Sequence, residues 1–222
     1  EQVTCPTPQA NLSLISGAKA LVGMANPAYA RKQKLTRHLE KLDADDVFLD
    51  LGAGTAFNVL DFFVAADRGI LVVEPEPTSI ENAYSFLRAA FYRRLELAML
   101  SHNVREVVAL AMDERNERGI RTPLDLLREV RALDPEEGAR FVETMRAFRP
   151  RLVVNEARTA EDVKLGFSVA GVCRRYFGIE AEYLGYVNHD EAARLSVVAR
   201  KPVIDFQAGS DAAIYLQRIA RK

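Results

Sequence analysis

The stretch that decides the fold is Val47-Phe-Leu-Asp-Leu-Gly-Ala-Gly-Thr55. An apolar run that ends in Asp50 and continues through Gly52 and Gly54 predicts a buried strand followed by a tight turn into a helix. Two kinds of nucleotide-type site are built on such a turn. In one, the acid holds a Mg²⁺ shell and the second glycine gives its backbone N–H to a γ-phosphate. In the other, the glycines make room for S-adenosylmethionine.

The rest of the chain alternates apolar runs with helical patterns, which predicts an α/β fold with a mostly parallel sheet covered on both faces. Besides residues 47–51, strands are predicted at residues 11–16, 69–74, 151–155 and 183–187. Helices are predicted at residues 29–42, 57–66, 78–95, 160–176, 191–200 and 210–221, with Thr78 or Ser79 as the N-cap of the third.

Polar residues follow these strands at the points where they end. Asp50, Glu74, Asn155 and Asn188 all stand at such ends. Ligands collect at the carboxyl ends of parallel strands, so these side chains mark the edge where a binding site is expected.

Length and composition predict one domain, residues 1–222, with a helical insertion at residues 101–150 in which Pro123 and Pro135 open new helices. The 30 basic and 31 acidic residues leave a net charge of −1, which gives no strong nucleic-acid signal. Cys5 and Cys173 lie far apart and have no metal-ligand spacing, as expected for reduced thiols in a cytoplasmic protein. The chain begins at Glu1 rather than at Met, and we expect an N-terminal truncation.

The strand-and-turn sequence at Asp50–Thr55 resembles the Asp-x-x-Ala-Gly turn of the MinD/ParA family of P-loop ATPases, and in particular of its MinD-like, FlhG-related members. The resemblance continues in three further segments and covers roughly residues 11–222. These segments are Leu71-Val-Val-Glu-Pro-Glu-Pro-Thr-Ser-Ile-Glu-Asn-Ala-Tyr84, Leu152-Val-Val-Asn-Glu-Ala-Arg158, and Tyr183-Leu-Gly-Tyr-Val-Asn-His-Asp190 with Lys201-Pro-Val203 after it. The resemblance implies a three-layer P-loop fold that lacks its N-terminal strands in this chain.

The resemblance also implies roles for five residues, with ATP and Mg²⁺ as cofactors. Asp50 binds Mg²⁺ through a coordinated water, and Gly54 donates its N–H to the γ-phosphate. Asn155 reads the adenine edge with its amide, Arg158 stacks on or flanks the base, and Asp190 lies in the loop that closes over the purine.

In biological terms, the resemblance implies an ATP-dependent switch that forms a homodimer when ATP is bound and separates after hydrolysis. Its partners would be a protein activator or cargo adaptor, and its output the positioning of the division site, flagella or another cargo. The resemblance implies a cytoplasmic location. It leaves open a peripheral contact with the inner face of the cell membrane through the final helix.

The sequence departs from the family most clearly in its phosphate loop, since the chain contains no Gly-x-x-x-x-Gly-Lys-Ser/Thr motif. Asn188 stands where the family has a Pro, and Gly52 stands where a Pro is frequent. In the family's sheet, the phosphate-loop strand separates strands that are present here. We therefore expect that residues 47–51 cannot pair with residues 69–74, and that the chain alone is not a competent ATPase.

Two other functions stay open at this point. An S-adenosylmethionine-dependent methyltransferase would place its cofactor against Gly52 and Gly54 and its ribose on Glu74 or Glu76. The bulky Phe57 after the turn and the small number of later strands count against it. A regulator with a nucleotide-binding fold that recruits partners without hydrolysis is the third alternative.

Overall fold

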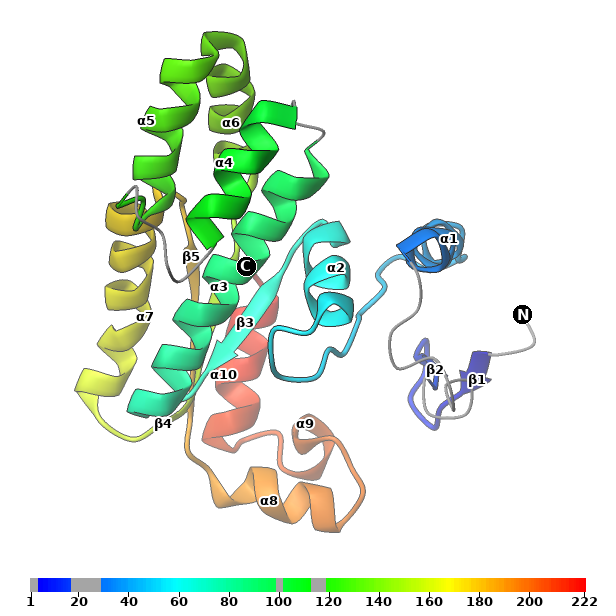
Figure 1. Cartoon of the computed structure of the whole chain (residues 1–222). Helices are drawn as coiled ribbons and strands as arrows, with labels where there is room; N and C mark the ends of the chain where they lie inside the picture. The colour runs from blue at the N-terminus through cyan, green and yellow to red at the C-terminus, as the bar shows by residue number, and fades with distance from the viewer. Residues whose placement is uncertain (1–3, 17–28, 99–101, 113–118) are drawn as a thin grey trace.

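The computed structural model describes residues 4–16, 29–98, 102–112 and 119–222 of the chain. These residues form a three-stranded parallel sheet with helices on both of its faces, a group of helices beyond one end of the sheet, and a small N-terminal hairpin (Figure 1). The fold is therefore α/β, as the alternation of apolar runs and helical patterns predicts.

The strands of the parallel sheet are β3 (Ile70–Val73), β4 (Arg151–Ala157) and β5 (Glu182–Asn188), and those of the hairpin are β1 (Thr4–Pro6) and β2 (Ser13–Ile15). The helices before β4 are α1 (Tyr29–Leu39), α2 (Phe57–Ala65), α3 (Pro77–Leu97), α4 (His102–Met112), α5 (Pro123–Leu133) and α6 (Pro135–Ala147). Those after it are α7 (Ala160–Val172), continued by a π-helical turn at Cys173–Phe177, then α8 (Glu191–Val198), α9 (Val203–Phe206) and α10 (Asp211–Ala220).

The central strand of the described sheet is β4, which pairs in parallel with β3 on one side and β5 on the other. Its apolar residues Leu152, Val153 and Val154 are buried, because both faces of the strand are covered. Parallel pairing places the carboxyl ends of β4 and β5 at the same edge, and Ala157 is paired with Asn188 there.

Alternate residues of the sheet face two different helical layers. On one face, Val73 and Val154 pack with Ala83 of α3 and Val163 of α7. On the other face, Val153 and Leu184 pack with Ala212 of α10. The period of two along each strand therefore separates two small cores, which gives three layers.

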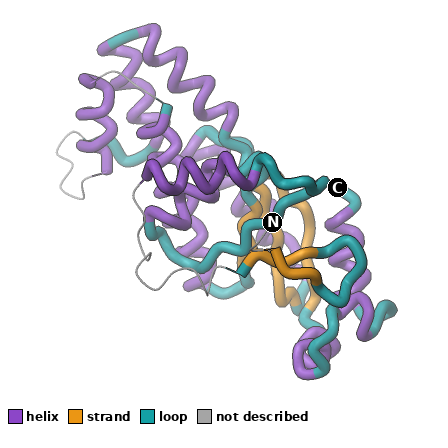
Figure 2. Tube along the Cα trace, turned by 90° about the vertical axis from the view of Figure 1, so that its right-hand side faces the viewer, coloured by secondary structure: helices purple, strands orange, loops and turns teal. Residues whose placement is uncertain are grey.

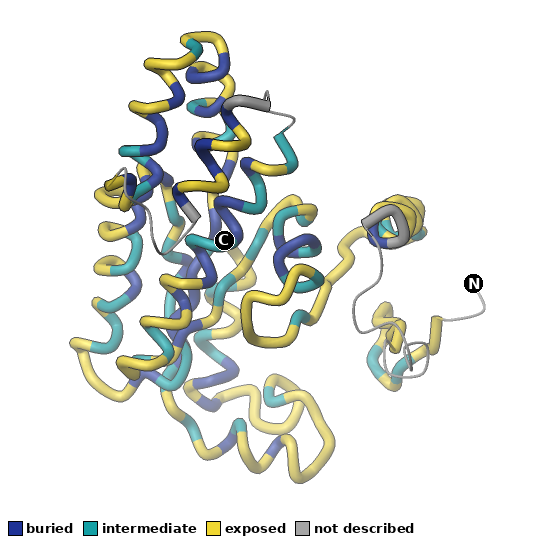
Figure 3. The backbone as a smooth tube through the Cα atoms, viewed as in Figure 1, coloured by how far each residue is buried: buried dark blue, intermediate teal, exposed yellow. Residues whose placement is uncertain are grey.

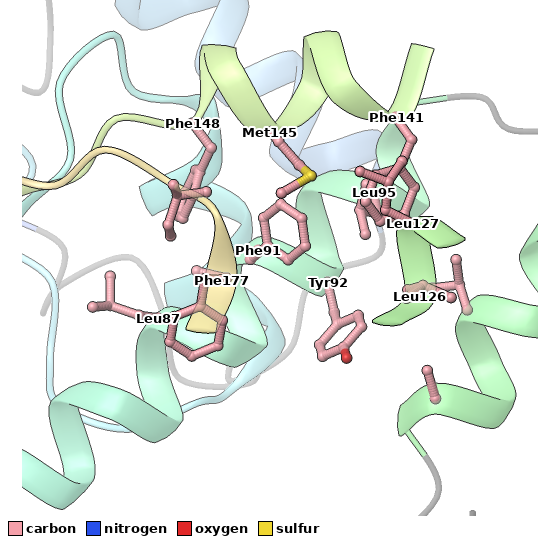
Figure 4. Packing of buried hydrophobic residues seen from close by; sticks show 14 of the residues in the cluster. Leu87, Phe91, Tyr92, Leu95, Leu126, Leu127, Phe141, Met145, Phe148 and Phe177 are labelled. Carbon is pink, nitrogen blue, oxygen red and sulfur yellow. The ribbon is translucent and has the colours of Figure 1, made fainter. Parts of the chain in front are cut away.

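The largest core lies among the helices rather than on the sheet (Figure 4). Phe91 of α3 is fully buried, and its ring centroid lies 6.1 Å from that of Phe141 and 6.0 Å from that of Phe148. Thr122 caps α5 with a capping box, Asp134 caps α6, and Pro123 and Pro135 stand in the first turns of these two helices. Helices α4, α5 and α6 thus contribute to this core, and α5 and α6 begin at the two prolines that predict new helices.

A buried ion-pair network connects the first three helices. Lys32 Nζ of α1 lies 2.5 Å from Asp61 Oδ2 of α2, and Arg93 Nε of α3 lies 2.6 Å from Asp61 Oδ1. The Lys32 and Asp61 side chains are buried, so removing Asp61 would leave the Lys32 charge uncompensated, whereas Asp61 also has Arg93 as a partner.

The prediction of a buried strand at residues 47–51 is wrong for this structure. The segment is not part of either sheet, and Phe48 is 84% exposed, although Leu51 packs against the helical core. A strand needs a neighbour for its backbone N–H and C=O groups, and the described residues provide none. This agrees with the expectation that residues 47–51 cannot pair with residues 69–74. The strand at residues 69–74 is present as β3, an edge strand whose Val72 is 59% exposed.

Two further predictions near strand and helix ends are corrected. The alternating residues 11–16 contribute β2, but β2 pairs antiparallel with β1 in an exposed hairpin outside the main sheet (Figure 3). Helix α3 begins at Pro77 with Glu76 as its N-cap residue, not at Thr78 or Ser79. The Ser79 hydroxyl instead accepts a hydrogen bond from the backbone N–H of Glu74.

Within the described residues, none of the helices has both the length and the apolar character that crossing a membrane requires.

The packing of α7 on β5 gives a prediction about two glycines of the same helix. A Cβ at Gly166 would collide with the Tyr183 ring, whose hydroxyl donates to the Val163 carbonyl oxygen at 2.9 Å. A Cβ at Gly171 would meet no described atom within 4 Å. Gly166→Ala is therefore expected to lower the free energy of unfolding by about 1–3 kcal/mol through overpacking. Gly171→Ala is expected to raise it by about 0.5–1 kcal/mol, because alanine favours the helix.

Urea denaturation of the two variants beside the parent chain measures both effects. Opposite signs are the expected result, and equal stabilisation by the two substitutions would contradict this packing of α7 on β5.

Candidate functional site

The candidate site lies at the carboxyl ends of β4 and β5, where the chain leaves the sheet toward α7 and α8 (Figure 1). Figure 2 shows strands in orange among helices in purple. The site is formed by residues 155–158 from the end of β4 and by His189 and Asp190 directly after β5. These two segments are more than 30 positions apart in the sequence and meet because the strands are parallel neighbours.

The side-chain amide of Asn155 has no hydrogen-bond partner among the described residues at this edge. Asn155 is the fifth residue of β4 and is half-buried. Both the carbonyl oxygen and the NH₂ group of the amide are therefore available to a ligand, and together they match the donor–acceptor edge of a nucleobase.

Arg158 is held in place by its backbone, while its side chain stays exposed. The carboxylate of Asp162 accepts the N–H groups of Arg158 and Thr159 at 2.8 and 2.9 Å, and Thr159 is the N-cap of α7. The backbone N–H of Arg158 is the largest cause that holds the pKa of Asp162 below its usual value. The guanidinium extends from this fixed turn toward the end of β5, where it reaches His189.

Asp190 has a structural task at this edge. Its carboxylate accepts the N–H of Ala192 at 2.9 Å and that of Ala212 at 3.0 Å, so it caps α8 and fixes the start of α10 beside it. Hydrogen bonds from Ala212 first and Ala192 second lower the pKa of Asp190. Asp190 thus shapes the loop after β5, and its oxygens are already occupied by backbone donors.

Sequence reasoning assigned no role to two further residues at this edge, Glu156 and His189. Glu156 has a left-handed backbone with φ +58°, next to an irregularity in the β4–β5 pairing between Val154 and Ala157. Its carboxylate contacts Nδ1 of His189, and the backbone N–H of His189 donates to the Ala157 carbonyl oxygen at 2.9 Å. The sequence does contain one indication of them, because Glu156 and His189 directly follow Asn155 and Asn188 at two predicted strand ends.

Asp50 and Gly54 form no described contact with the candidate site. Both are exposed in the segment between α1 and α2, and Gly54 has φ +102° with open space where a Cβ would be. No hydrogen bond or ion pair within the described ranges links either of them to Asn155, Arg158 or Asp190. Asn155, Arg158 and Asp190 lie on two neighbouring chain segments at the ends of β4 and β5, and no described hydrogen bond or ion pair joins them to one another.

No protein-family model matches this chain, and none of the curated proteins compared with it matches either. The resemblance to the MinD/ParA family consequently rests on the sequence segments quoted above.

The capping role of Asp190 gives a pH-dependent prediction. Because its pKa is lower in the folded chain than the usual 3.8, Asp190 stabilises the fold above that pH. The contribution is lost as the pH falls through the lower folded-state pKa. Asp190→Asn keeps one acceptor and removes the charge, so it is expected to lower the melting temperature at pH 7, and the difference from the parent chain should shrink below about pH 4.

Thermal unfolding followed by circular dichroism between pH 3 and 7 measures this difference. Exposed Asp43, for which no contact is described, provides the control Asp43→Asn. A melting-temperature difference for Asp190→Asn that stays the same from pH 7 to pH 3 would contradict the electrostatic role.

Proposed function

We propose that the edge formed by β4 and β5 is the base side of an adenine-nucleotide site. We propose further that the protein is an ATP-dependent dimerising switch of the MinD/ParA type, with a P-loop fold. Such a switch acts with a protein activator or cargo adaptor and positions the division site, flagella or another cargo.

One observation carries this proposal: at the carboxyl edge of a parallel sheet, the Asn155 amide has no hydrogen-bond partner among the described residues, and Arg158 follows it on a fixed turn. Asn155 offers a donor and an acceptor side by side, as the edge of adenine requires. Arg158 presents an exposed planar guanidinium that is able to stack on a base. The position agrees with the general placement of ligands in sheets of this kind.

The described residues fit the base of ATP better than they fit its metal ion. Asp50 is a single exposed carboxylate, and no group of three or more His, Cys, Asp or Glu residues with metal-binding geometry occurs in the described parts of the chain. Mg²⁺ is commonly held by one or two carboxylates together with phosphate oxygens and waters. Asp50 is the residue of this chain that would provide a carboxylate ligand to the ion.

The methyltransferase alternative loses its main support in this structure. It needs Gly52 and Gly54 at the end of a strand in the sheet, and residues 47–51 lie outside the sheet. The roles proposed for Asp50 and Gly54 need the same strand, whereas those of Asn155 and Arg158 do not depend on it. The base side of the site is for this reason the part of the proposal that this chain can test.

Calorimetric titration with Mg-ATP tests the base site directly. We expect saturable binding that becomes about tenfold weaker in Asn155→Ala, because one pair of hydrogen bonds to the base is lost. Asn188→Ala is the matched control, since the Asn188 amide is already bonded to Asp211 at 3.1 Å. That variant should keep its affinity within about threefold of the parent chain.

The same titration with S-adenosylmethionine separates the alternatives. Binding of S-adenosylmethionine without binding of Mg-ATP would contradict the proposal and favour the methyltransferase. Equal weakening of Mg-ATP binding by Asn155→Ala and Asn188→Ala would contradict the specific role of Asn155.

The rate of ATP hydrolysis tests whether this chain alone is an ATPase or only binds the base of the nucleotide. Because the sequence has no Gly-x-x-x-x-Gly-Lys-Ser/Thr motif, the 222 residues alone are expected to release no phosphate from Mg-ATP above the rate of a heat-denatured control. A phosphate-release assay checks this. Steady turnover that disappears in Asp50→Ala would show that this chain is an ATPase by itself and would overturn the expectation.

A further inference from the structure

The Nδ1 atom of His189 faces two side chains of opposite charge. A carboxylate oxygen of Glu156 contacts this nitrogen, and Nη2 of Arg158 lies 3.1 Å from it. Arg158 Nη2 and Glu156 Oε2 lie 4.0 Å apart. We call these three residues the Glu156–Arg158–His189 cluster.

One imidazole nitrogen cannot serve both neighbours at the same time. A protonated Nδ1 donates a hydrogen bond to the Glu156 carboxylate, and it then has no lone pair for Arg158. An unprotonated Nδ1 accepts a hydrogen bond from the guanidinium of Arg158, and it then has nothing to donate to Glu156. The cluster therefore has two exclusive hydrogen-bond arrangements, and they differ in whether Arg158 is held.

The backbone fixes all three members of the cluster near one another. The left-handed conformation of Glu156 is rarely adopted by a residue with a side chain, and the surrounding strand pairing maintains it here. His189 is anchored by its N–H to the Ala157 carbonyl oxygen, and Arg158 by its N–H to Asp162. A change of hydrogen-bond partner consequently requires only side-chain rotation.

The other charged groups close to His189 are occupied elsewhere. Asp190 accepts two backbone N–H groups, and Asp162 accepts the N–H groups of Arg158 and Thr159. Glu191 of α8 pairs with Arg194, whose hydrogen bond is the largest cause of the lowered pKa of Glu191. Glu156 and Arg158 are thus the groups that compete for the imidazole.

We propose that His189 is the positioning residue for Arg158 and that its proton decides whether Arg158 is held at the base site. With Nδ1 unprotonated, the guanidinium is bonded to His189 and is ready to contact the base. With the imidazole protonated, His189 pairs with Glu156 and repels Arg158 from its place. This inference rests on the proposed nucleotide site, and it makes nucleotide affinity fall when His189 gains its second proton.

The test is calorimetric titration with Mg-ATP at pH 5.5 and pH 8, in the parent chain and in His189→Gln. The glutamine carbonyl is able to accept the Arg158 hydrogen bond at either pH. The parent chain should bind about fivefold more weakly at pH 5.5 than at pH 8, beyond any pH effect seen in His189→Gln. The terminal phosphate of ATP also titrates near pH ~6, and its effect is common to both proteins.

An equal pH dependence in the parent chain and in His189→Gln would overturn the inference while leaving the proposed nucleotide site intact. Failure of the parent chain to bind Mg-ATP at either pH would overturn the proposed site itself.

A second measurement tests the cluster without any ligand. The ¹⁵N chemical shifts of the His189 imidazole are followed against pH in the parent chain, in Glu156→Gln and in Arg158→Gln. Removing the carboxylate should move the Nδ1 signal toward that of a nitrogen without hydrogen, and removing the guanidinium should move it toward that of a nitrogen that carries hydrogen. An Nδ1 signal that neither variant moves would overturn the exchange of partners.

Discussion

Parallel pairing of β4 with β5 is the interaction on which the rest of this structure depends. It buries the apolar run of β4 between two helical layers, and it brings the ends of two distant chain segments to one edge. The pairing continues past the regular strands, since the N–H of His189 reaches the Ala157 carbonyl oxygen. Every residue of the candidate site owes its position to this register. A slip by one residue would reverse which side chains face the core and would disperse the site.

Helix α3 connects the sheet to the helical core and so couples the two parts of the molecule. Near its start, Ala83 packs against the sheet, and farther along, Phe91 lies at the centre of the aromatic cluster with Phe141 and Phe148. The same helix holds Arg93, which joins the buried pair of Lys32 and Asp61. Since a buried charge that loses its partner is costly, this network ties α1 and α2 to α3. The helical region thereby supports the sheet from one side and leaves the carboxyl edge of β4 and β5 accessible.

The sequence predicts well those features that depend on local pattern. The three strands of the parallel sheet were evident from continuous apolar runs, and α5 and α6 from Pro123 and Pro135. Residues 47–51 have an equally strong strand pattern, yet a strand requires a partner that no local pattern reveals. That residues 155–158 and 188–190 lie at one edge followed from strand ends in a parallel sheet. The contact between Glu156 and His189 did not, because it depends on a left-handed backbone at Glu156. The capping role of Asp190 depends on α10, which is distant in sequence.

The central claim is that a nucleotide base binds at the edge formed by β4 and β5, and the most direct test is to locate the bound ligand residue by residue. Backbone amide resonances of the ¹⁵N-labelled chain would be recorded while Mg-ATP is added. We expect saturable shifts concentrated at residues 155–158 and 188–191, with residues of the aromatic core around Phe91 unchanged. Shifts that are absent from both strand ends, or that appear only in the helical region at residues 102–147, would contradict it.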